Sequence, residues 1–181
     1  IHVTRFDTDT GTLVRGFTKD FNKKGINKVI LDLRDNGGGY VSAAKDLISL
    51  WVDSKAVLVQ KSTKLADETT YSAHGQADLA DMKTIVLVNG STASASEIVA
   101  GALQDYKKAT IVGEQTYGKG VVQSLVNLSH GSLLKVTTAH WYTPNGTSIN
   151  KTGITPDKVV ERTYEDINKN KDPQLDAALG M

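Results

Sequence analysis

The 181-residue sequence contains no cysteine, which excludes a disulfide framework, a thiol nucleophile and a cysteine-ligated zinc site. The absence of cysteine does not indicate the cellular compartment, because oxidising environments tolerate cysteine-free chains as well as reducing environments do. The four histidines are scattered, no pair has the spacing of an H-E-x-x-H metal motif, and the acidic residues are dispersed. We therefore expect neither a metal ion nor an organic cofactor.

Long apolar runs and an excess of charge are also missing. No run of about 18 apolar residues is present, and the sequence opens on IHVTRF without the basic start and apolar block of a signal peptide. A formal net charge of +1 gives no electrostatic case for binding nucleic acid or an anionic membrane. With 39% hydrophobic and 23% charged residues, the chain fits one ordinary globular domain that is long enough to bury a core.

Apolar periodicity predicts strands that alternate with helices, which is typical of an α/β domain. A polar segment at residues 63–81 has no clear pattern and is expected to be a loop or a weak hairpin. Two strands late in the sequence flank Ser129-His130-Gly131 and predict an antiparallel hairpin. The predicted helices cover residues 8–24, 41–51, 94–107 and a short stretch after Pro173, and the predicted strands cover residues 28–33, 56–61, 84–88, 109–113, 121–128, 132–142 and part of 154–160.

Ser94 is the first residue with catalytic potential. It lies in NGSTASASE, residues 89–97, where a buried strand gives way to an amphipathic helix. A serine exposed at such an elbow is a candidate nucleophile, and the neighbouring Ala93 and Ala95 would let a substrate backbone approach closely. Ser94-Ala95-Ser96-Glu97 also fits an S-x-x-E capping box, in which the serine hydroxyl only caps the helix. For a serine in this motif, capping alone is the commoner outcome.

A serine nucleophile needs a base, and Lys119 is the second candidate. It lies in TYGKGVVQ, and it can remove a proton only if a desolvated setting lowers its pKa toward neutrality. Apolar neighbours such as Tyr117 predict such a setting, although a lysine between glycines is usually a solvated surface charge. If the stretch is a strand, Gln123 shares a face with Lys119 and can orient its amine. His74, in the loop before the nucleophile strand, is the alternative base.

A glycine-rich segment, Asn36-Gly37-Gly38-Gly39, follows the first predicted strand. Such a segment can be a flexible turn or a phosphate cradle, but neither G-x-G-x-x-G nor G-x-x-x-x-G-K-[ST] occurs, which disfavours nucleotide binding. Glycine also lets a backbone N–H face a substrate without a side chain in the way. One such amide, together with the amide of Ala95, can form an oxyanion hole.

Taken together, these segments resemble the carboxyl-terminal processing peptidases, or tail-specific proteases, a serine/lysine peptidase family also known as S41. The resemblance covers nearly the whole chain, and the 25-residue separation of Ser94 and Lys119 is the one expected for the family. The segments that carry it are DLRDNGGG at residues 32–39, STASASEIVAGALQDY at 91–106, VGEQTYGKGVVQ at 112–123 and PNGTSINKTGITPD at 144–157.

The resemblance implies a role for each matching residue. Ser94 is then the nucleophile, Lys119 the general base and Gln123 its orienting partner, while the amides of Gly39 and Ala95 form the oxyanion hole. The implied fold is a crotonase- or ClpP-like ββα core with a C-terminal antiparallel hairpin. The implied activity is cofactor-free cleavage of protein substrates near their C-termini through a Ser/Lys dyad.

Family members usually carry a secretion signal and a PDZ domain, and neither is found in this sequence. Residues 1–181 are therefore expected to form one peptidase core domain without its PDZ domain, whose absence puts regulated activity in doubt. The implied partners are the C-termini of protein or peptide substrates, and the family also allows a homo-oligomer. The implied location is outside the cytoplasm, in a bacterial cell envelope.

Two other functions compete with proteolysis. A non-catalytic relative of the same fold would hold an apolar ligand, but it would not need Ser94, Lys119 and Gln123 together. A crotonase-type acyl-CoA enzyme would need a basic or glycine-rich pocket for the adenosine phosphates and a placed carboxylate, and the sequence offers neither.

Overall fold

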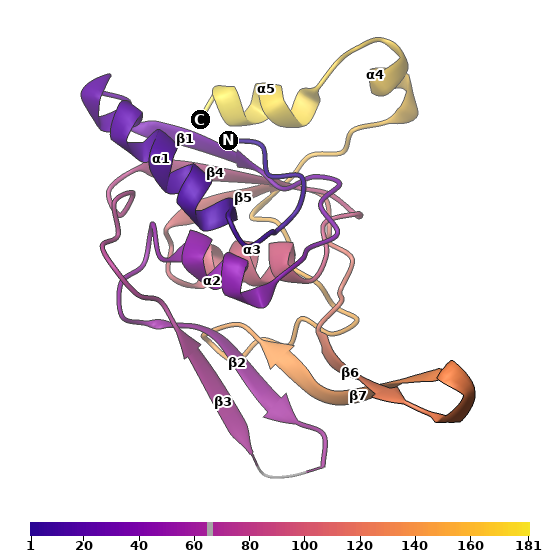
Figure 1. Cartoon of the computed structure of the whole chain (residues 1–181). Helices are drawn as coiled ribbons and strands as arrows, with labels where there is room; N and C mark the ends of the chain where they lie inside the picture. Colours follow the sequence, from indigo (N-terminus) through magenta and orange to yellow (C-terminus); the bar gives the residue numbers. More distant parts are fainter. Residues whose placement is uncertain (65–66) are drawn as a thin grey trace.

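The computed structural model describes residues 1–64 and 67–181, without the side chains of Lys19 and Asn22. Its elements build an α/β fold with one parallel and one antiparallel sheet (Figure 1). In chain order they are α1 (Thr10–Lys23), β1 (Lys28–Asp32), α2 (Val41–Ile48), β2 (Ala56–Ser62), β3 (Glu68–Ser72), β4 (Lys83–Val88), α3 (Ala95–Asp105), β5 (Ala109–Gly113), β6 (Val121–Asn127), the 3-10 turn η1 (Ser129–Gly131), β7 (Leu133–Tyr142), β8 (Lys158–Val159), α4 (Tyr164–Asn168) and α5 (Pro173–Leu179).

The first sheet is parallel, with the strand order β1-β4-β5-β8. Both of its faces are covered, so β4 is a continuous apolar run, as is usual for a buried parallel strand. Successive side chains of β4 point to opposite faces: Ile85 and Leu87 pack in the cluster that includes Ala178 of α5, whereas Val86 and Val88 belong to the main core. Helices α2 and α3 lie on that second side (Figure 1).

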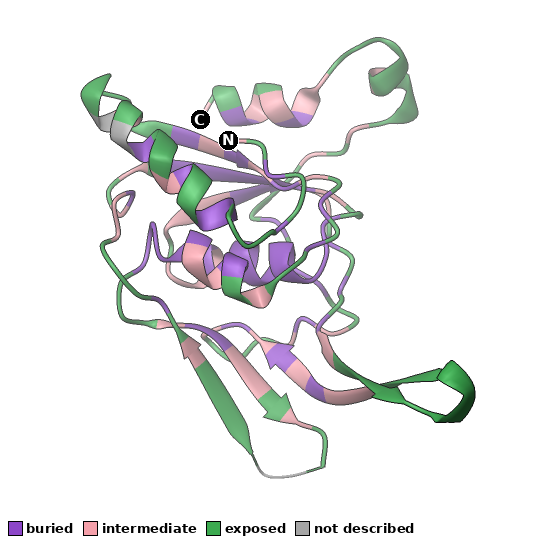
Figure 2. Cartoon of the chain, viewed as in Figure 1, coloured by how far each residue is buried: buried purple, intermediate pink, exposed green. Residues whose placement is uncertain are grey.

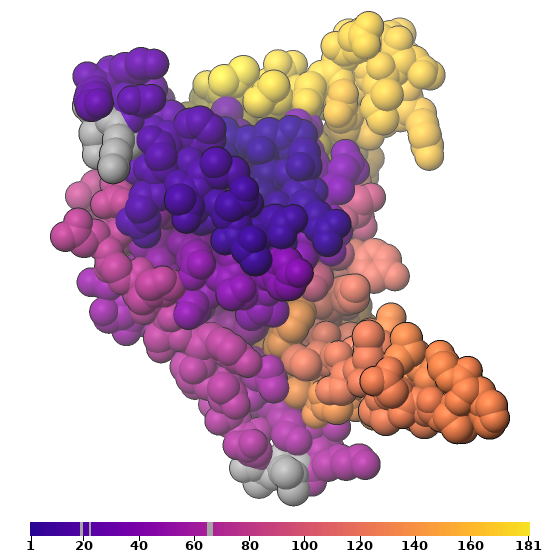
Figure 3. Space-filling model, in the orientation of Figure 1, coloured from indigo at the N-terminus to yellow at the C-terminus, as the bar shows by residue number. Residues whose placement is uncertain are grey.

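The second sheet is antiparallel, with the order β3-β2-β7-β6, and it lies beyond α2 and α3 (Figure 1). The expected hairpin of residues 121–142 is confirmed, and its tip projects from the body as an exposed ribbon (Figures 2 and 3). The segment at residues 63–81 takes the hairpin alternative, because β3 pairs with β2, while residues 65–66 lie outside the described part. The antiparallel sheet is therefore larger than the single hairpin that the sequence predicted.

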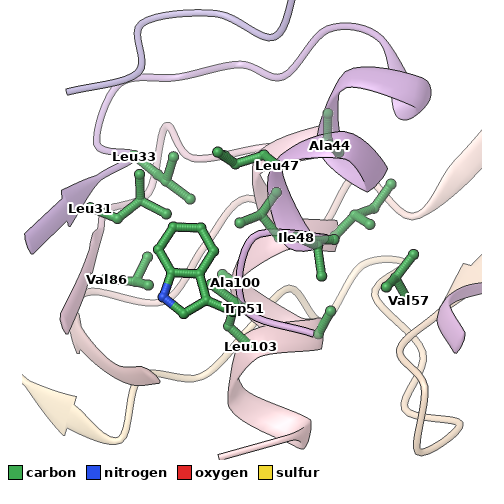
Figure 4. Close-up of a cluster of buried hydrophobic side chains, with 14 of the residues drawn as sticks. Leu31, Leu33, Ala44, Leu47, Ile48, Trp51, Val57, Val86, Ala100 and Leu103 are labelled. Carbon is green, nitrogen blue, oxygen red and sulfur yellow. The ribbon is translucent and has the colours of Figure 1, made fainter. Parts of the chain in front are cut away.

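The centre of the main core is the indole of Trp51, just beyond α2 (Figure 4). Trp51 is fully buried, and its Nε1 donates to Thr84 Oγ1 at 2.8 Å, which satisfies the one polar group that the ring carries. The predicted inward face of the second helix is confirmed, because Ala44, Leu47 and Ile48 are also fully buried. This packing fixes α2 between the two sheets.

The other helices and strands predicted from the sequence are found, with ends shifted by a few residues. Helix α1 ends at Lys23, and Gly25, two residues later, has a φ of 64°, the left-handed conformation common after a helix C-terminus. The sequence did not predict α4, a five-residue helix in the charged tail. Within the described ranges, none of the helices combines the length and the apolar character needed to cross a membrane.

The C-terminal tail is attached to the sheet through Arg34, which follows β1. The Arg34 guanidinium bonds to both Asp32 oxygens and to both Asp172 oxygens, at distances of 2.7–2.9 Å. Asp172 also caps α5 by accepting from the Leu175 amide at 3.0 Å. Partial burial acts to raise the pKa of Asp172, but the hydrogen bonds from Arg34 and Leu175 and the nearby positive charges outweigh it and hold this pKa below 3.8.

We predict that Asp172→Asn lowers the free energy of unfolding by about 1 kcal/mol at neutral pH, because the ion pair is lost while asparagine still caps the helix. A carboxylate with a depressed folded-state pKa stabilises the fold above its unfolded-state pKa and loses this contribution as the pH falls through the folded-state value. The difference between the two proteins should therefore shrink toward zero below pH 3.8. Urea unfolding at a series of pH values measures it. Asp176→Asn, an exposed change on the same helix, is the control, and an equal pH dependence there would refute the assignment.

Candidate active site

The loops that carry the candidate residues leave the same edge of the parallel sheet. The glycine segment follows β1, Ser94 follows β4, and Lys119 follows β5. These strands are parallel and adjacent, so their carboxyl ends meet at one edge, which is where open α/β sheets commonly bind ligands. The fold therefore brings together three segments that are up to 80 residues apart in the sequence.

Ser94 occupies a strained turn at the start of α3. Its φ of 58° and ψ of −117° lie outside the regions that residues with a side chain normally adopt. Non-glycine residues in such conformations cluster at functional sites, and a nucleophile elbow is one example. Ser94 is only 8% exposed, so it is less open than the sequence suggested.

The capping box expected at Ser94 is present, but its bonds differ from a simple hydroxyl cap. The Glu97 carboxylate accepts from the Ser94 amide at 2.8 Å, whereas the Glu97 amide donates to the Ser94 carbonyl oxygen at 2.9 Å. The hydroxyl takes part in the box only as an acceptor facing the Glu97 amide, and it donates no hydrogen bond to any residue in the described part of the chain. Capping thus leaves the hydroxyl available for chemistry.

Glu97 joins the serine turn to the lysine loop. It is fully buried, and its Oε2 accepts from the amides of both Ser94 (2.8 Å) and Lys119 (2.9 Å). Its Oε1 accepts from Thr116 Oγ1 and from the Gly118 amide, each at 2.6 Å. Both backbone nitrogens, of Ser94 and of Lys119, donate to the same oxygen. The distance between the two nitrogens therefore cannot exceed the sum of the two hydrogen-bond distances.

The glycine segment is fixed against the serine turn by Asn36. The fully buried Asn36 side chain accepts from the Gly38 amide at 2.9 Å and donates to the Val3 carbonyl at 2.7 Å. Its own carbonyl accepts from the Ala93 amide at 3.0 Å. A side chain on Gly38 would approach Ser94 Cβ to 2.8 Å and the Ala95 amide nitrogen to 2.9 Å, so only glycine fits beside the serine.

The two amides expected to form an oxyanion hole lie next to this contact. Gly39 follows Gly38 in the chain, and Ala95 follows Ser94. Neither amide donates a hydrogen bond to an acceptor among the residues that the structure describes, whereas the Gly38 amide is already bonded to Asn36. The two amides that the sequence proposed for an oxyanion hole thus lack a hydrogen-bond acceptor in the described part of the chain.

Lys119 does not have the shielded setting that the sequence predicted. Its side chain is exposed and Tyr117 is 68% exposed, so the expected desolvation is wrong for this structure. The flanking glycines pack instead against a later segment: a side chain on Gly118 would meet Lys151 at 2.9 Å, and one on Gly120 would meet Asn150 at 2.2 Å. This packing holds the backbone inward and leaves the lysine side chain at the surface.

The side chains of the proposed dyad are not joined to each other or to Gln123. In the described part of the chain, no hydrogen bond links the Ser94 hydroxyl, the Lys119 amine and the Gln123 amide. Gln123 is exposed on β6, which begins only at Val121, so the expected shared strand face does not extend to Lys119.

His74, the alternative base, lies at the opposite end of α2 from the glycine segment. Its amide donates to Ser49 Oγ at 3.1 Å, and its exposed ring is 3.5 Å from Asp46. Gly39 precedes the first residue of the eight-residue helix, whose length is about 12 Å at 1.5 Å per residue. This arrangement favours Lys119 over His74.

Comparison with known proteins gives the class of this chain. The family model of Peptidase family S41 matches residues 1–160. The chain belongs to this family.

Several relatives carry names that specify the family further. The carboxyl-terminal-processing protease of Synechocystis sp. is 40% identical over 184 aligned residues, which cover 100% of this chain and 43% of the relative. The carboxy-terminal-processing protease of Bartonella bacilliformis is 39% identical and covers 97% of this chain and 41% of its own length. This chain therefore spans less than half the length of these relatives.

Solved structures agree with the fold. The photosystem II D1 C-terminal processing protease superposes with a TM-score of 0.81 at 38% identity, covering 88% of this chain and 41% of that one. The tricorn protease superposes with a TM-score of 0.68 over 99% of this chain and 17% of its own, at 19% identity, and this likeness concerns the fold alone.

Glu97 and Asn36 are the site residues whose roles the sequence did not reveal. Glu97 was visible only as the acidic partner in a capping box, and Asn36 only as the start of the glycine segment. The signal for Glu97 was its position three residues after the candidate nucleophile. Its bonds to residues 116–119 depend on the pairing of β4 with β5, which local sequence does not reveal.

We predict that Glu97→Gln lowers the free energy of unfolding by about 3 kcal/mol and slows modification of Ser94 by a fluorophosphonate. The amide is the same size as the carboxylate, but its NH₂ group would face two hydrogen-bond donors. Urea unfolding and a time course of labelling measure the two effects. Glu161→Gln is the control, because Glu161 is exposed, and it should change stability by no more than about 0.5 kcal/mol. If both variants behaved alike, Glu97 would not hold the two loops together.

Proposed function

We propose that this chain is the peptidase core of a serine endopeptidase that cleaves protein substrates near their C-termini through a Ser94/Lys119 dyad. The observation that carries the proposal is the Glu97 carboxylate, which holds the strained backbone of Ser94 and the backbone of Lys119 on one oxygen. The named relatives are carboxyl-terminal processing proteases, and substrate class and site of cleavage are carried over from them.

In the proposed reaction, the neutral amine of Lys119 takes the proton of the Ser94 hydroxyl while Oγ attacks the carbonyl carbon of a peptide bond. The carbonyl oxygen becomes an oxyanion, which the amides of Gly39 and Ala95 stabilise. Lys119 then gives the proton to the leaving amine as the C–N bond breaks. Water attacks the acyl-enzyme in the second half-reaction, with Lys119 again as the base, and releases Ser94.

The proposed dyad needs only a side-chain movement. The Ser94 and Lys119 backbones are already held together by Glu97, and the lysine amine sits on a flexible four-carbon stem. In our proposal, rotation of this stem from the surface toward Ser94 forms the dyad, and Gln123 of β6 then holds the rotated amine. Active sites often complete such contacts only when the substrate is bound.

The finer features of the chain belong to the same proposal. We propose that its α/β core is of the crotonase- or ClpP-like ββα type. We also propose that residues 1–181 form one catalytic domain. We also place the protein outside the cytoplasm, at a bacterial cell envelope, and infer that substrate C-termini are its partners. The support for these features is the family membership and the bacterial relatives.

A non-catalytic ligand-binding role is the second candidate, because Lys119 is exposed and is not bonded to Ser94. The two functions differ in whether Ser94 is reactive. A fluorophosphonate that modifies Ser94, located by mass spectrometry of the labelled peptide, supports the peptidase. A protein that binds peptides but is not labelled supports the ligand-binding role.

We predict that Ser94→Ala and Lys119→Ala each lower kcat/KM by about 10⁴-fold or more and leave the fold intact, because the dyad acts as a unit. Hydrolysis of an unfolded protein or a fluorogenic peptide measures the rates, and circular dichroism checks the fold. His74→Ala is the control and should keep most of the activity. Retention of activity in Lys119→Ala with loss in His74→Ala would assign the base to His74.

A further inference from the structure

A cavity of about 270 Å³ lies between α2 and the antiparallel sheet, next to the candidate active site. Its residues come from α2, β2, β3, β6 and β7, whose arrangement is visible in Figure 1. Drug-sized molecules occupy pockets of about 300–1,000 Å³, so this cavity has the size for a single large side chain.

Backbone connections place this cavity beside the reacting groups. Val41 lines it and lies two residues after Gly39, while Val122 lines it and lies three residues after Lys119. Trp141 forms a third wall, and its amide donates to the carbonyl of Gly120 at 2.9 Å, directly beside Lys119. A peptide bond held between Ser94 and the glycine segment therefore has this cavity within reach of an adjacent side chain.

The lining combines apolar walls with hydrogen-bond donors that have no acceptor. Val41, Val122 and the mostly buried ring of Trp141 supply the apolar surface. The Lys45 amine forms no ion pair or hydrogen bond with any described residue, and the same holds for the indole N–H of Trp141.

The remaining polar groups do not neutralise this positive charge. The Tyr71 hydroxyl donates to Gln60 Oε1 at 3.1 Å, which uses the one amide oxygen in the lining, and no aspartate or glutamate lines the cavity. The Ser42 hydroxyl, which also lines the cavity, can donate as well as accept, so the lining offers several donors and one cation but no negative charge. A carboxylate on a substrate side chain complements these donors and the Lys45 amine, whereas a positively charged side chain does not.

We propose that this cavity binds a substrate side chain adjacent to the scissile bond, that it accepts apolar and acidic side chains and rejects basic ones, and that Lys45 makes this distinction. The proposal rests on the proposed peptidase function and adds the substrate class. Apolar walls stabilise the stem of either accepted kind of side chain. Lys45 attracts a carboxylate and repels an ammonium or guanidinium group, with an energy reduced by the solvent at the cavity mouth.

Charge reversal tests the proposal. A peptide library is digested by the wild-type chain and by Lys45→Glu, and the products are sequenced by mass spectrometry. The ratio of acidic to basic residues at one position next to the cleaved bond should fall by at least about tenfold in Lys45→Glu, the factor that 1.4 kcal/mol of discrimination gives. Lys24→Glu makes the same change in net charge on an exposed residue after α1 and should leave the profile unchanged. An unchanged profile in Lys45→Glu overturns the proposal and leaves the peptidase function standing.

Filling the cavity provides a second test. Val122→Phe places a ring in the space, so large apolar residues should be lost from the same position of the profile while alanine and glycine remain. Loss of selectivity at a different position, or at none, contradicts the assignment. Labelling of Ser94 by a fluorophosphonate confirms that each variant retains the nucleophile in place.

A binding assay keeps the proposal testable if the isolated chain does not cleave peptides. Acidic, apolar and basic peptides are titrated into Ser94→Ala and into the Ser94→Ala/Lys45→Glu double variant. Tryptophan fluorescence reports binding at Trp141, and Trp141→Phe identifies the remaining signal of the buried Trp51. Tighter binding of acidic than of basic peptides, reversed in the double variant, supports the cavity assignment, and equal affinities overturn it. Absence of cleavage with this selectivity present would contradict the peptidase function alone.

Discussion

The buried carboxylate of Glu97 is the constraint on which the arrangement of the site depends. A charge removed from water is tolerated only when other groups replace its solvation, and here four donors from two loops do so. Three of them are backbone amides, so the carboxylate fixes main-chain positions. The serine turn after β4 and the lysine loop after β5 become one unit, which keeps the backbones of the proposed nucleophile and the proposed base close to each other.

This unit also explains how Ser94 keeps a conformation that most residues avoid. A strained residue of this kind costs on the order of 1–3 kcal/mol and persists only where its surroundings determine it fully. At Ser94 the surroundings are Glu97 at the amide, Gly38 against Cβ, and Asn36, whose carbonyl holds the preceding Ala93. The strain is therefore balanced by contacts from α3 and from the glycine segment, which ties the geometry of Ser94 to that of the glycine segment.

Much of the fold was predictable because its signals are local. The apolar run of β4 and the periodicity of α2 reflect burial of their own residues, and both elements were found where the sequence indicated them. The resemblance named Ser94 and Lys119, and the common edge of β4 and β5 explains why their loops lie side by side. The exposure of Lys119 was not predictable, because it results from packing of Gly118 and Gly120 against residues 149–153, some thirty residues away in the sequence. Glu97 was missed for the same reason, since its partners belong to a loop that only the strand pairing brings near.

The exposed lysine and the adjacent cavity fit one account of catalysis. An amine can accept the serine proton only in its neutral form, and exclusion of solvent favours this form. A substrate whose side chain enters the cavity lined by Val41 and Val122 spans the space between the glycine segment and the start of β6. Lys119 lies two residues before the first residue of β6, so this substrate covers its surroundings and supplies the missing desolvation. Under this account, the contacts that select the substrate also activate the base, and a peptide that fails to fill the cavity is cut slowly even if it reaches Ser94.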